Sequence, residues 1–485
     1  MQRCLVWFRR DLRLADNPAL AQAVADAQRV IAVYIHAPEE SDPWRPGAAS
    51  DWWLHHSLTA LEHDLRVRGS RLIVRPGPTL STLQALVRET GAGAVYWNRL
   101  YEPALAERDT KIEQALRESG VSALSFNAAL LFEPEELLSG QKAPYRVFTA
   151  FWRAGAARLA ELPRPQPAPK RLPGAGDDLA APAIDSLAIE QLDLLPRIAW
   201  DQGFRIWQPG EAGALARLAR FQEGVASYPD DRNRPDLEGS SRLSPHLHFG
   251  EIGPRQVLAA ILQRAAGSGA TMRGADLFAK EIGWREFAHH LLHHFPHTAE
   301  RPLDARFEQY PWNRDAAALA SWQHGRTGVP IVDAGMRELW STGWMHNRVR
   351  MIVASFLTKN LRIHWLEGAR WFWDTLLDAD LANNTLGWQW TAGCGADAAP
   401  YFRVFNPVLQ AQRFDPQRQY IRRWVPEIAG MPDALIHRPW DADAGTLAAA
   451  GVRLGAVYPR PIVDLRASRA AALSGYRTLR ELART

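Results

Sequence analysis

The feature that most constrains the fold is an alternation of short apolar, β-branched runs with amphipathic stretches over the first 130 residues. The runs that read as strands are Leu5 to Phe8, Val30 to His36, Arg71 to Arg75, Ala94 to Asn98 and Val121 to Phe126. Helical patterns separate them, near residues 18–27, 51–68, 79–90 and 103–119. Strands that alternate with helices form a parallel sheet covered on both faces. The sequence therefore predicts a doubly wound α/β domain over residues 1–130.

The segment after the first strand reads RRDLRLADNP and contains no glycine. Glycines in that turn let the backbone approach a pyrophosphate in dinucleotide-binding domains. A Rossmann-type dinucleotide site is therefore not expected in this domain.

The chain changes character at residues 162–182, which read LPRPQPAPKRLPGAGDDLAAP. Prolines and small residues favour an extended, weakly packed connection. We place the domain boundary there and treat residues 131–204 as a linker. After about residue 205 the strand patterns give way to helical ones, near residues 212–222, 254–266, 275–294, 331–340, 344–359 and 365–378. Residues 205–485 are predicted to form an all-α domain.

Composition indicates an ordinary globular protein, with 47% hydrophobic and 23% charged residues. No apolar run approaches the roughly 18 residues that cross a bilayer, and charged residues come too early for a signal peptide. Two cysteines, Cys4 and Cys394, build neither a disulfide framework nor a CxxC metal site. We expect a soluble protein of a reducing compartment, without membrane contact. The net charge of +4 is weak evidence for nucleic acid.

Tryptophan is unusually frequent, with 20 residues in the chain. Before residue 90 there are Trp7, Trp44, Trp52 and Trp53, and the others lie later. Large planar rings pack cores, and they also stack on bases and isoalloxazine rings. The enrichment alone does not distinguish the two uses.

The string Ser240-Ser241-Arg242-Leu243-Ser244-Pro245 has the pattern of a helix N-cap, at Ser244, followed by proline in the first turn. We predict that a helix starts there. Hydroxyls, a guanidinium and free backbone amides also suit a phosphate group. By itself the string fits a capped helix start at least as well.

The helix predicted over residues 275–294 places Glu281, Trp284 and Arg285 at i, i+3 and i+4, on one face. Histidines cluster at the end of this helix and just beyond it, at His289, His290, His293, His294 and His297. Such a cluster could suggest a metal site. Carboxylate or cysteine ligands at a matching spacing are missing, so we expect no metal and interpret these histidines as solvated or capping.

Two later segments combine polar and aromatic side chains. In the helix that opens at Trp344, Asn347, Arg350 and Met351 share a face and Arg348 is expected to point elsewhere. Asp378, Asp380 and Asn384 precede Gly387-Trp388-Gln389-Trp390. Their spacing departs from a calcium-binding loop, so we predict a hydrogen-bonding role, with Arg350 as a counter-charge for one carboxylate.

These motifs together closely resemble the DNA photolyase and cryptochrome flavoproteins, over almost the whole chain. The segments that carry the resemblance are residues 6–13 (VWFRRDLR), 240–245, 283–287 (GWREF), 344–351, 387–390 and 401–403. Their common order makes a chance match negligible.

The resemblance implies FAD in the helical domain. The residues expected to hold it are Tyr228, Ser240, Ser241, Arg242, Leu243, Ser244, Arg285, Asp378 and Asp380. Asn384 is expected to face the central ring of the flavin, with the pair of Arg350 and Asp378 over the isoalloxazine. Family members use light to pass an electron from reduced flavin to a pyrimidine dimer in DNA, which splits.

The resemblance also implies how damaged DNA is held. Glu281 and Asn347 would hydrogen-bond a flipped-out dimer, Trp284 and Trp390 would stack on it, and Arg348 would bind a phosphate. Further phosphate candidates are Arg232, Arg234, Arg403 and Arg413. Six-four photolyases carry histidine where this chain has Asn347 and Met351, so the resemblance favours a photolyase for cyclobutane dimers. A cryptochrome-type blue-light photoreceptor without repair activity is the alternative.

The resemblance also bears on electron supply, on a second chromophore and on assembly. Trp388, Trp365 and Trp312 would carry electrons from the surface to the flavin, or else are core aromatics. Glu102 matches a position that holds methenyltetrahydrofolate in related enzymes, although a deazaflavin or an empty cleft is the alternative. We expect a monomer without an obligate protein partner, in the bacterial cytoplasm and nucleoid-associated when bound to DNA.

Overall fold

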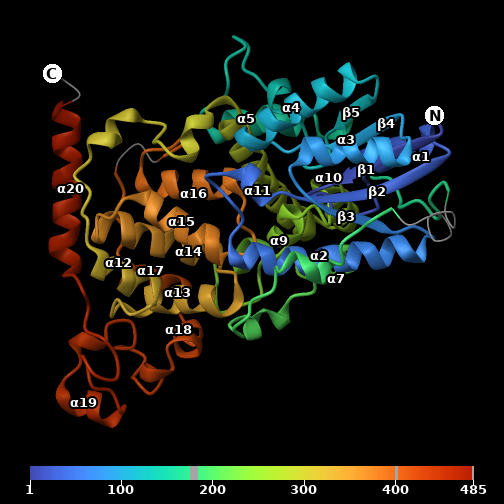
Figure 1. The fold of residues 1–485 in the computed structure, drawn as a ribbon. Helices are drawn as coiled ribbons and strands as arrows, with labels where there is room; N and C mark the ends of the chain where they lie inside the picture. Colours follow the sequence, from blue (N-terminus) through green and yellow to red (C-terminus); the bar gives the residue numbers. More distant parts are fainter. Residues whose placement is uncertain (175–183, 399–401, 483–485) are drawn as a thin grey trace.

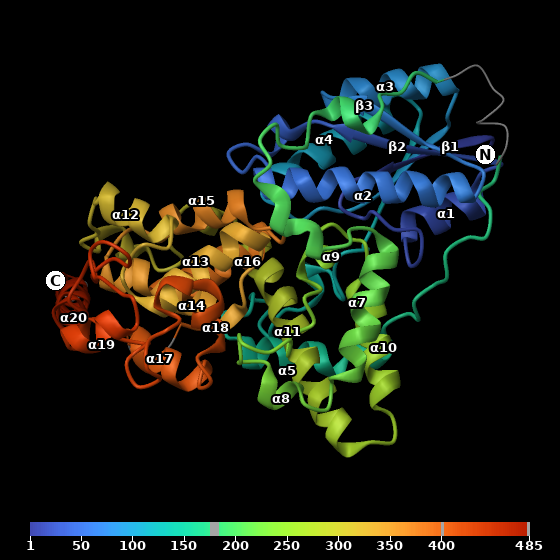
Figure 2. The ribbon, with the colours of Figure 1, turned by 90° about the horizontal axis from the view of Figure 1, so that it is seen from below.

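The structure is a computed structural model that describes residues 1–174, 184–398 and 402–482. A sheet domain built from the start of the chain lies beside a larger body of helices, as Figures 1 and 2 show. The expected motif residue Tyr401 lies outside the described residues.

The sheet is wholly parallel and has the order β3-β2-β1-β4-β5. Its strands are β1 (Arg3–Phe8), β2 (Arg29–His36), β3 (Leu72–Pro76), β4 (Ala94–Asn98) and β5 (Ser122–Phe126). The helices between them are α1 (Pro18–Asp26), α2 (Ala48–Val67), α3 (Thr79–Thr90) and α4 (Pro103–Glu118). The predicted doubly wound α/β domain is confirmed, with strand ends that differ from the expected ones by a few residues at most.

Side chains that alternate along each strand divide this domain into two cores. Val6, Ala32 and Tyr96 pack with residues of α1 and α2 on one face, whereas Leu5 and Val33 pack with residues of α3 and α4 on the other. Two covered faces explain why the strands read as nearly continuous apolar runs.

The rest of the chain is helical, as predicted. Its helices are α5 (Phe148–Ala157), α7 (Glu211–Glu223), α8 (Tyr228–Asp231), α9 (Ser244–His248), α10 (Pro254–Ala265), α11 (Gly269–His294), α12 (Ala316–Gln323), α13 (Pro330–Thr342), α14 (Asn347–Ser355), α15 (Trp365–Thr375), α16 (Leu381–Ala392), α17 (Pro407–Phe414), α18 (Gln419–Trp424), α19 (Ala444–Ala449) and α20 (Leu465–Leu482). None of the described helices is long and apolar enough to cross a membrane.

The structure differs from the predicted helix limits at two places that matter for the site. A single helix over residues 344–359 is wrong, because the ring of His346 accepts the Arg348 amide and α14 begins only at Asn347. The helix predicted to end at 378 ends at Thr375, and Asp380 then caps the next one. Short extended stretches therefore precede α14 and α16.

The segment expected as a linker, residues 131–204, is more than a connection. Phe148 and Phe151 of α5 belong to the same buried core as residues of α11. Part of this segment therefore packs as helical-domain core, while the proposed domain limits stay a prediction.

The two domains share buried structure. The carboxylate of Glu251, fully buried, accepts the indole N–H of Trp53 from α2 at 2.9 Å and the backbone N–H of Gly210 at 2.6 Å, and contacts the ring of His246 in α9. Trp207, Phe249 and Trp344 join the core on the α1 and α2 side of the sheet. This interface anchors α9 and the start of the Trp344 segment.

Candidate active site: a polar cavity in the helical domain

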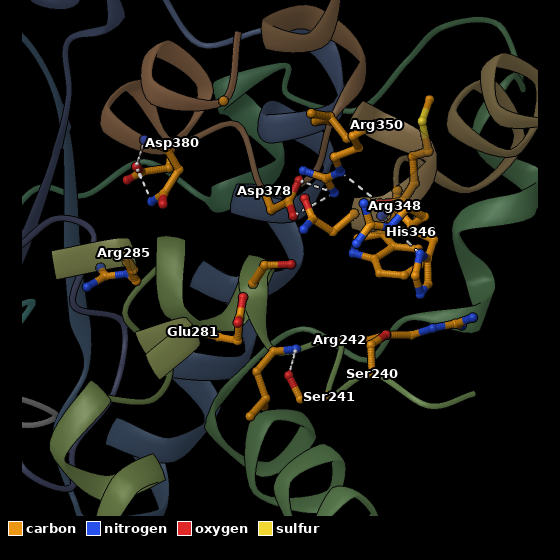
Figure 3. A pocket seen from close by; sticks show the side chains of 18 of the residues that line it. Ser240, Ser241, Arg242, Glu281, Arg285, His346, Arg348, Arg350, Asp378 and Asp380 are labelled. Carbon is orange, nitrogen blue, oxygen red and sulfur yellow. Dashed lines mark hydrogen bonds and ion pairs between the residues drawn. The ribbon is translucent and has the colours of Figure 1, made fainter. Parts of the chain in front are cut away.

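One cavity of about 360 Å³ collects side chains from widely separated parts of the helical domain. It lies between α8, α9, α11, α14 and α16, and Figure 3 shows the labelled side chains that meet there. The predicted residues that line it are Tyr228, Ser240, Ser241, Arg242, Leu243, Ser244, Glu281, Arg285, Asn347, Arg348, Arg350, Met351, Asp378, Asp380, Asn384 and Trp388. The structure thus brings most of the expected set together.

The serine string forms one wall. Helix α9 begins at Ser244, as predicted. The N-cap position is occupied by Leu243 and not by Ser244, and no side chain caps the helix. Arg242 adopts a left-handed backbone, with φ of 51°, and its guanidinium stacks 4.8 Å from the ring centre of Trp344. With Ser244 not used as a cap, the serine hydroxyls along this wall suit a phosphate-bearing ligand.

Arg350 and Asp378 form a forked pair in the opposite wall. One nitrogen, Nη2, lies 3.0 and 2.9 Å from the two carboxylate oxygens, and Nε donates to the carbonyl of Met345 at 2.7 Å. The Asp378 side chain is only 3% exposed. Figure 3 shows the two side chains turned toward each other, as the sequence predicted.

Asp380 connects three elements. Its Oδ1 accepts the Asn383 amide at 2.8 Å and so caps α16, while Oδ2 lies 3.4 Å from His289 of α11 and 3.7 Å from His248 of α9. Burial opposes ionisation, but the two histidines and their hydrogen bonds hold the pKa of Asp380 well below its usual range. The carboxylate therefore stays charged.

Asn384 and Gly387, one turn apart on α16, both line the cavity. The Asn384 amide nitrogen donates to the carbonyl of Ala369 at 2.9 Å, which leaves its Oδ1 for a ligand. A Cβ added to Gly387 would meet no atom within 4 Å. A planar ring with a hydrogen-bond donor fits this wall.

Glu281 and Arg348 lie on the side of the cavity bordered by the loop after α8. Glu281 forms an ion pair of 2.7 Å with Arg232, not with Arg285, whose Nη1 donates to the carbonyl of Ala129 at 2.6 Å. The expectation that Arg348 points away from Asn347 and Met351 is wrong. All three line the cavity, because Arg348 and Met351 are one turn apart on α14 and Arg348 Nη1 lies 3.6 Å from the Met351 sulfur.

The prediction that the five histidines are solvated or capping is wrong for His289 and His290, which are buried, whereas His293 and His294 are half-buried in the last turn of α11 and His297 is exposed. His289 is 7% and His290 is 1% exposed, and His290 accepts the Tyr145 amide at 3.0 Å. Burial lowers the pKa of His290 to about 4. Among the described residues no group of histidine, cysteine and acidic side chains could hold a metal ion.

Trp284 and Trp390 do not line the main cavity in the part of the chain that the structure describes. Trp284 stacks on Phe148 of α5, with ring centres 3.8 Å apart. The Trp390 indole donates to the carbonyl of Asp397 at 3.0 Å, beside Lys359 and Arg403. Their role as stacking partners of a base stays a prediction.

The three tryptophans expected to carry electrons extend from the cavity toward the surface. Trp388 lines the cavity, and a Cβ on Gly368 of α15 would collide with its ring. Trp365, one turn earlier on α15, is buried and lies 5.6 Å from His364, which lies 5.1 Å from the half-buried Trp312. The ring of His364 contacts both Trp365 and Trp312, and the role of the three tryptophans in electron transfer stays a prediction.

Glu102 lies in a second cleft of about 120 Å³, between the sheet domain and the helical domain. Both carboxylate oxygens of Glu102 accept hydrogen bonds from Arg10. The rings of Trp7, Tyr34, Trp44 and Trp373 line this cleft, and His248 lines both cavities.

The family profile for the FAD binding domain of DNA photolyase matches residues 278–478, and the DNA photolyase profile matches residues 4–170. A deoxyribodipyrimidine photo-lyase of Agrobacterium fabrum is 45% identical over 98% of both chains. The chain belongs to the DNA photolyase family. Cryptochrome-1 of Arabidopsis thaliana is 41% identical over 96% of this chain and 69% of its own length.

A solved photolyase structure agrees with this assignment. A bacterial class III photolyase from Agrobacterium tumefaciens has a TM-score of 0.93 and 44% identity, over 99% of this chain and 98% of that one. This photolyase binds FAD. The matched FAD binding domain includes Arg350, Asp378, Asp380 and Asn384 of the cavity, and their role in holding FAD stays a prediction.

Sequence reasoning missed several lining residues, among them Asn233, His248, His346 and Asn383. His248 lies three positions after the Ser240 to Pro245 string, in the helix that the string predicts, and this position was an available signal. Asn233 follows an arginine in a loop without a periodic pattern, so no signal singled it out.

Asp380→Asn tests how the cavity holds FAD. Asparagine is also a good N-cap, so α16 should persist while the charge facing the two histidines is lost. We expect about tenfold weaker FAD retention, in line with loss of a charged hydrogen bond. The flavin released on denaturation, per chain, measures it.

Asp443→Asn is the matched control, because Asp443 caps α19 through Thr446 away from the cavity. Equal FAD content in both variants would show that the Asp380 charge is not needed for retention.

Proposed function

We propose that this photolyase repairs cyclobutane pyrimidine dimers in DNA in a light-dependent reaction. The observation that carries the proposal is that Glu281, Asn347 and Met351 line the same cavity as the residues expected to hold FAD. Relatives named deoxyribodipyrimidine photo-lyase over the full chain length support it. When bound, reduced FAD would absorb the light and pass one electron to the dimer, which splits and returns the electron to the flavin.

The protein's own residues do the binding and positioning. A dimer must leave the duplex to enter the cavity, at a cost of a few kcal/mol. Glu281, with a side chain 29% exposed, and Asn347 offer hydrogen bonds to its polar edge. Burial and the surrounding arginines lower the pKa of His346 to about 3, so this ring adds no positive charge to the cavity. Exclusion of water strengthens the hydrogen bonds.

Glu281→Gln tests the lesion assignment. The amide keeps the shape but loses the carboxylate, so repair of cyclobutane dimers at limiting substrate should fall about tenfold or more. Six-four products should remain unrepaired by the parent protein. Counting both lesions in irradiated DNA, after exposure to blue light with reduced protein, gives the result.

Glu308→Gln provides the control, since Glu308 is also ion-paired with an arginine but lies on the surface. Repair of six-four products, or no dimer repair by the reduced parent protein, would contradict the proposal. The second outcome would favour the cryptochrome-type photoreceptor, which the similarity to Arabidopsis cryptochrome-1 keeps as the alternative.

We further propose that the second cleft holds a light-harvesting chromophore of the methenyltetrahydrofolate type. Both carboxylate oxygens of Glu102 already accept hydrogen bonds from Arg10. The other carboxylate that lines the cleft is Asp51, which forms no ion pair with any described residue. Asp51 is therefore available to bind the edge of a pterin ring. Burial raises the pKa of Asp51 to about 6. Donor groups of a bound ring would stabilise its ionised form.

Asp51→Asn should reduce binding of the second chromophore several-fold and leave FAD in place. The check is the near-ultraviolet absorption that FAD does not account for, after reconstitution with methenyltetrahydrofolate. Asp64→Asn, on the same helix but outside the cleft, is the control. Full absorption in Asp51→Asn would remove Asp51 from the site.

We also propose that Trp388, Trp365 and Trp312 carry electrons to oxidised flavin. Trp365→Phe keeps most of the apolar volume, so the fold should hold. We expect it to abolish light-driven reduction of oxidised flavin by an external donor while dimer repair after chemical reduction continues. Absorption spectra during illumination provide the measurement.

Trp97→Phe, in the sheet domain, serves as the matched control, because Trp97 is equally buried. Photoreduction of Trp365→Phe at the parent rate would mean that electrons take another route. Trp322, whose ring lies 6.0 Å from Trp388, would then be the next residue to substitute.

Finally, we propose a monomer without an obligate protein partner, in the bacterial cytoplasm and on the nucleoid when bound to DNA. The family's action on DNA supports the last point. Sedimentation and imaging of a fluorescent fusion test these statements.

A further inference from the structure

The guanidinium of Arg348 is held by an amide. Asn233 Oδ1 accepts hydrogen bonds from Nη2 at 2.7 Å and from Nε at 3.2 Å. The guanidinium also stacks 4.5 Å from the ring centre of Phe414, and Nη1 lies 3.6 Å from the Met351 sulfur. No carboxylate among the described residues forms an ion pair with Arg348.

Neighbouring arginines of the same loop are treated differently. Arg232 is paired with Glu281 at 2.7 Å, and Arg234 bonds both carboxylate oxygens of Asp236. Asn233 lies between these two arginines in the chain. Arg232 and Arg234 are each paired with a charged carboxylate, whereas the partner of Arg348 is the neutral amide oxygen of Asn233.

The surroundings of Arg348 are positively charged. Burial lowers its pKa, and Arg232, Arg413 and Arg403 lower it further, while Glu281 opposes them. Arg413 lies over the same Phe414 ring, at 5.1 Å. A partly buried cation crowded by other cations is unfavourable unless an anion arrives. A phosphate group is such an anion, and arginine binds it through its planar fork.

We propose that Asn233 is a positioning residue for DNA binding, which orients Arg348 without cancelling its charge so that a backbone phosphate is its counter-ion. The inference rests on the proposed function, because it requires that the cavity receives DNA. The amide oxygen fixes the fork before DNA arrives, so less side-chain freedom is lost on binding. A carboxylate at the same place would compete with the phosphate.

Asn233→Asp tests this, since the two side chains have the same shape and differ in charge. Each phosphate contact contributes about 0.9 to the slope of log affinity against log salt on duplex DNA. We expect Asn233→Asp to lower the slope by about 0.9 and to weaken dimer-containing and intact duplexes equally. The holoenzyme is titrated with labelled duplexes across a series of salt concentrations, with melting temperatures measured alongside.

Gln114→Glu, on the exposed side of α4, changes the net charge equally and is expected to bind like the parent. Asn233→Ala keeps every charge and is the second variant. We expect it to retain the slope but to lose affinity, because the guanidinium is no longer oriented. In an Arg348→Ala background, Asn233→Asp should have no further effect.

The experiments distinguish failure of the role of Asn233 from failure of the proposed function. If Arg348→Ala lowers the slope and Asn233→Asp binds like Gln114→Glu, the role of Asn233 is overturned and the function stands. If Arg348→Ala itself keeps the parent slope, the phosphate assignment of Arg348 fails, and the inference fails with it. Dimer repair by the same Arg348→Ala protein shows whether the proposed function survives.

Discussion

The cavity depends on one carboxylate, that of Asp380, whose side chain is 13% exposed. Asp380 caps α16, which carries Asn384 and Trp388, and the same side chain contacts His289 of α11 and His248 of α9. Three elements that lie far apart in the chain are therefore held at one point. Because burial alone would favour the neutral acid, the charge persists through these partners, and the pKa of Asp380 stays low.

The wall at Asp380 also separates the two cavities. His248 lines both, and Arg10, which binds Glu102 in the second cleft, lies close enough for the charge of Asp380 to act on it. Burial tends to lower the pKa of Arg10, but the charges of Glu102 and Asp380 raise it overall. The candidate FAD site and the second cleft therefore share their electrostatics as well as a wall, and the helical domain contributes residues to both.

On the proposed DNA-binding side, the arginines differ in whether a carboxylate balances their charge. Arg232 is balanced by Glu281 and Arg234 by Asp236, whereas Arg348 is hydrogen-bonded to a neutral amide. A phosphate gains most from an arginine that has no carboxylate to displace. The ion pair of Glu281 with Arg232 uses the Oε1 oxygen of the carboxylate.

Much of this photolyase follows from local pattern. The alternation in the first 130 residues specifies a parallel sheet, because strands that are buried on both faces must be apolar throughout. The strings around Ser240, Trp344 and Asp378 identified the cavity-lining set, and the Arg350 and Asp378 pair followed from charge. Long-range packing decided the rest. Trp284 is covered by Phe148 from a segment expected to be a linker, and Glu102 is neutralised by Arg10, which is 92 positions away in the chain. Arg348 lines the cavity with its guanidinium held by Asn233 and Phe414, which come from distant parts of the chain. Periodicity describes one element at a time, so it carries no information on which distant side chain satisfies a buried charge or covers a ring.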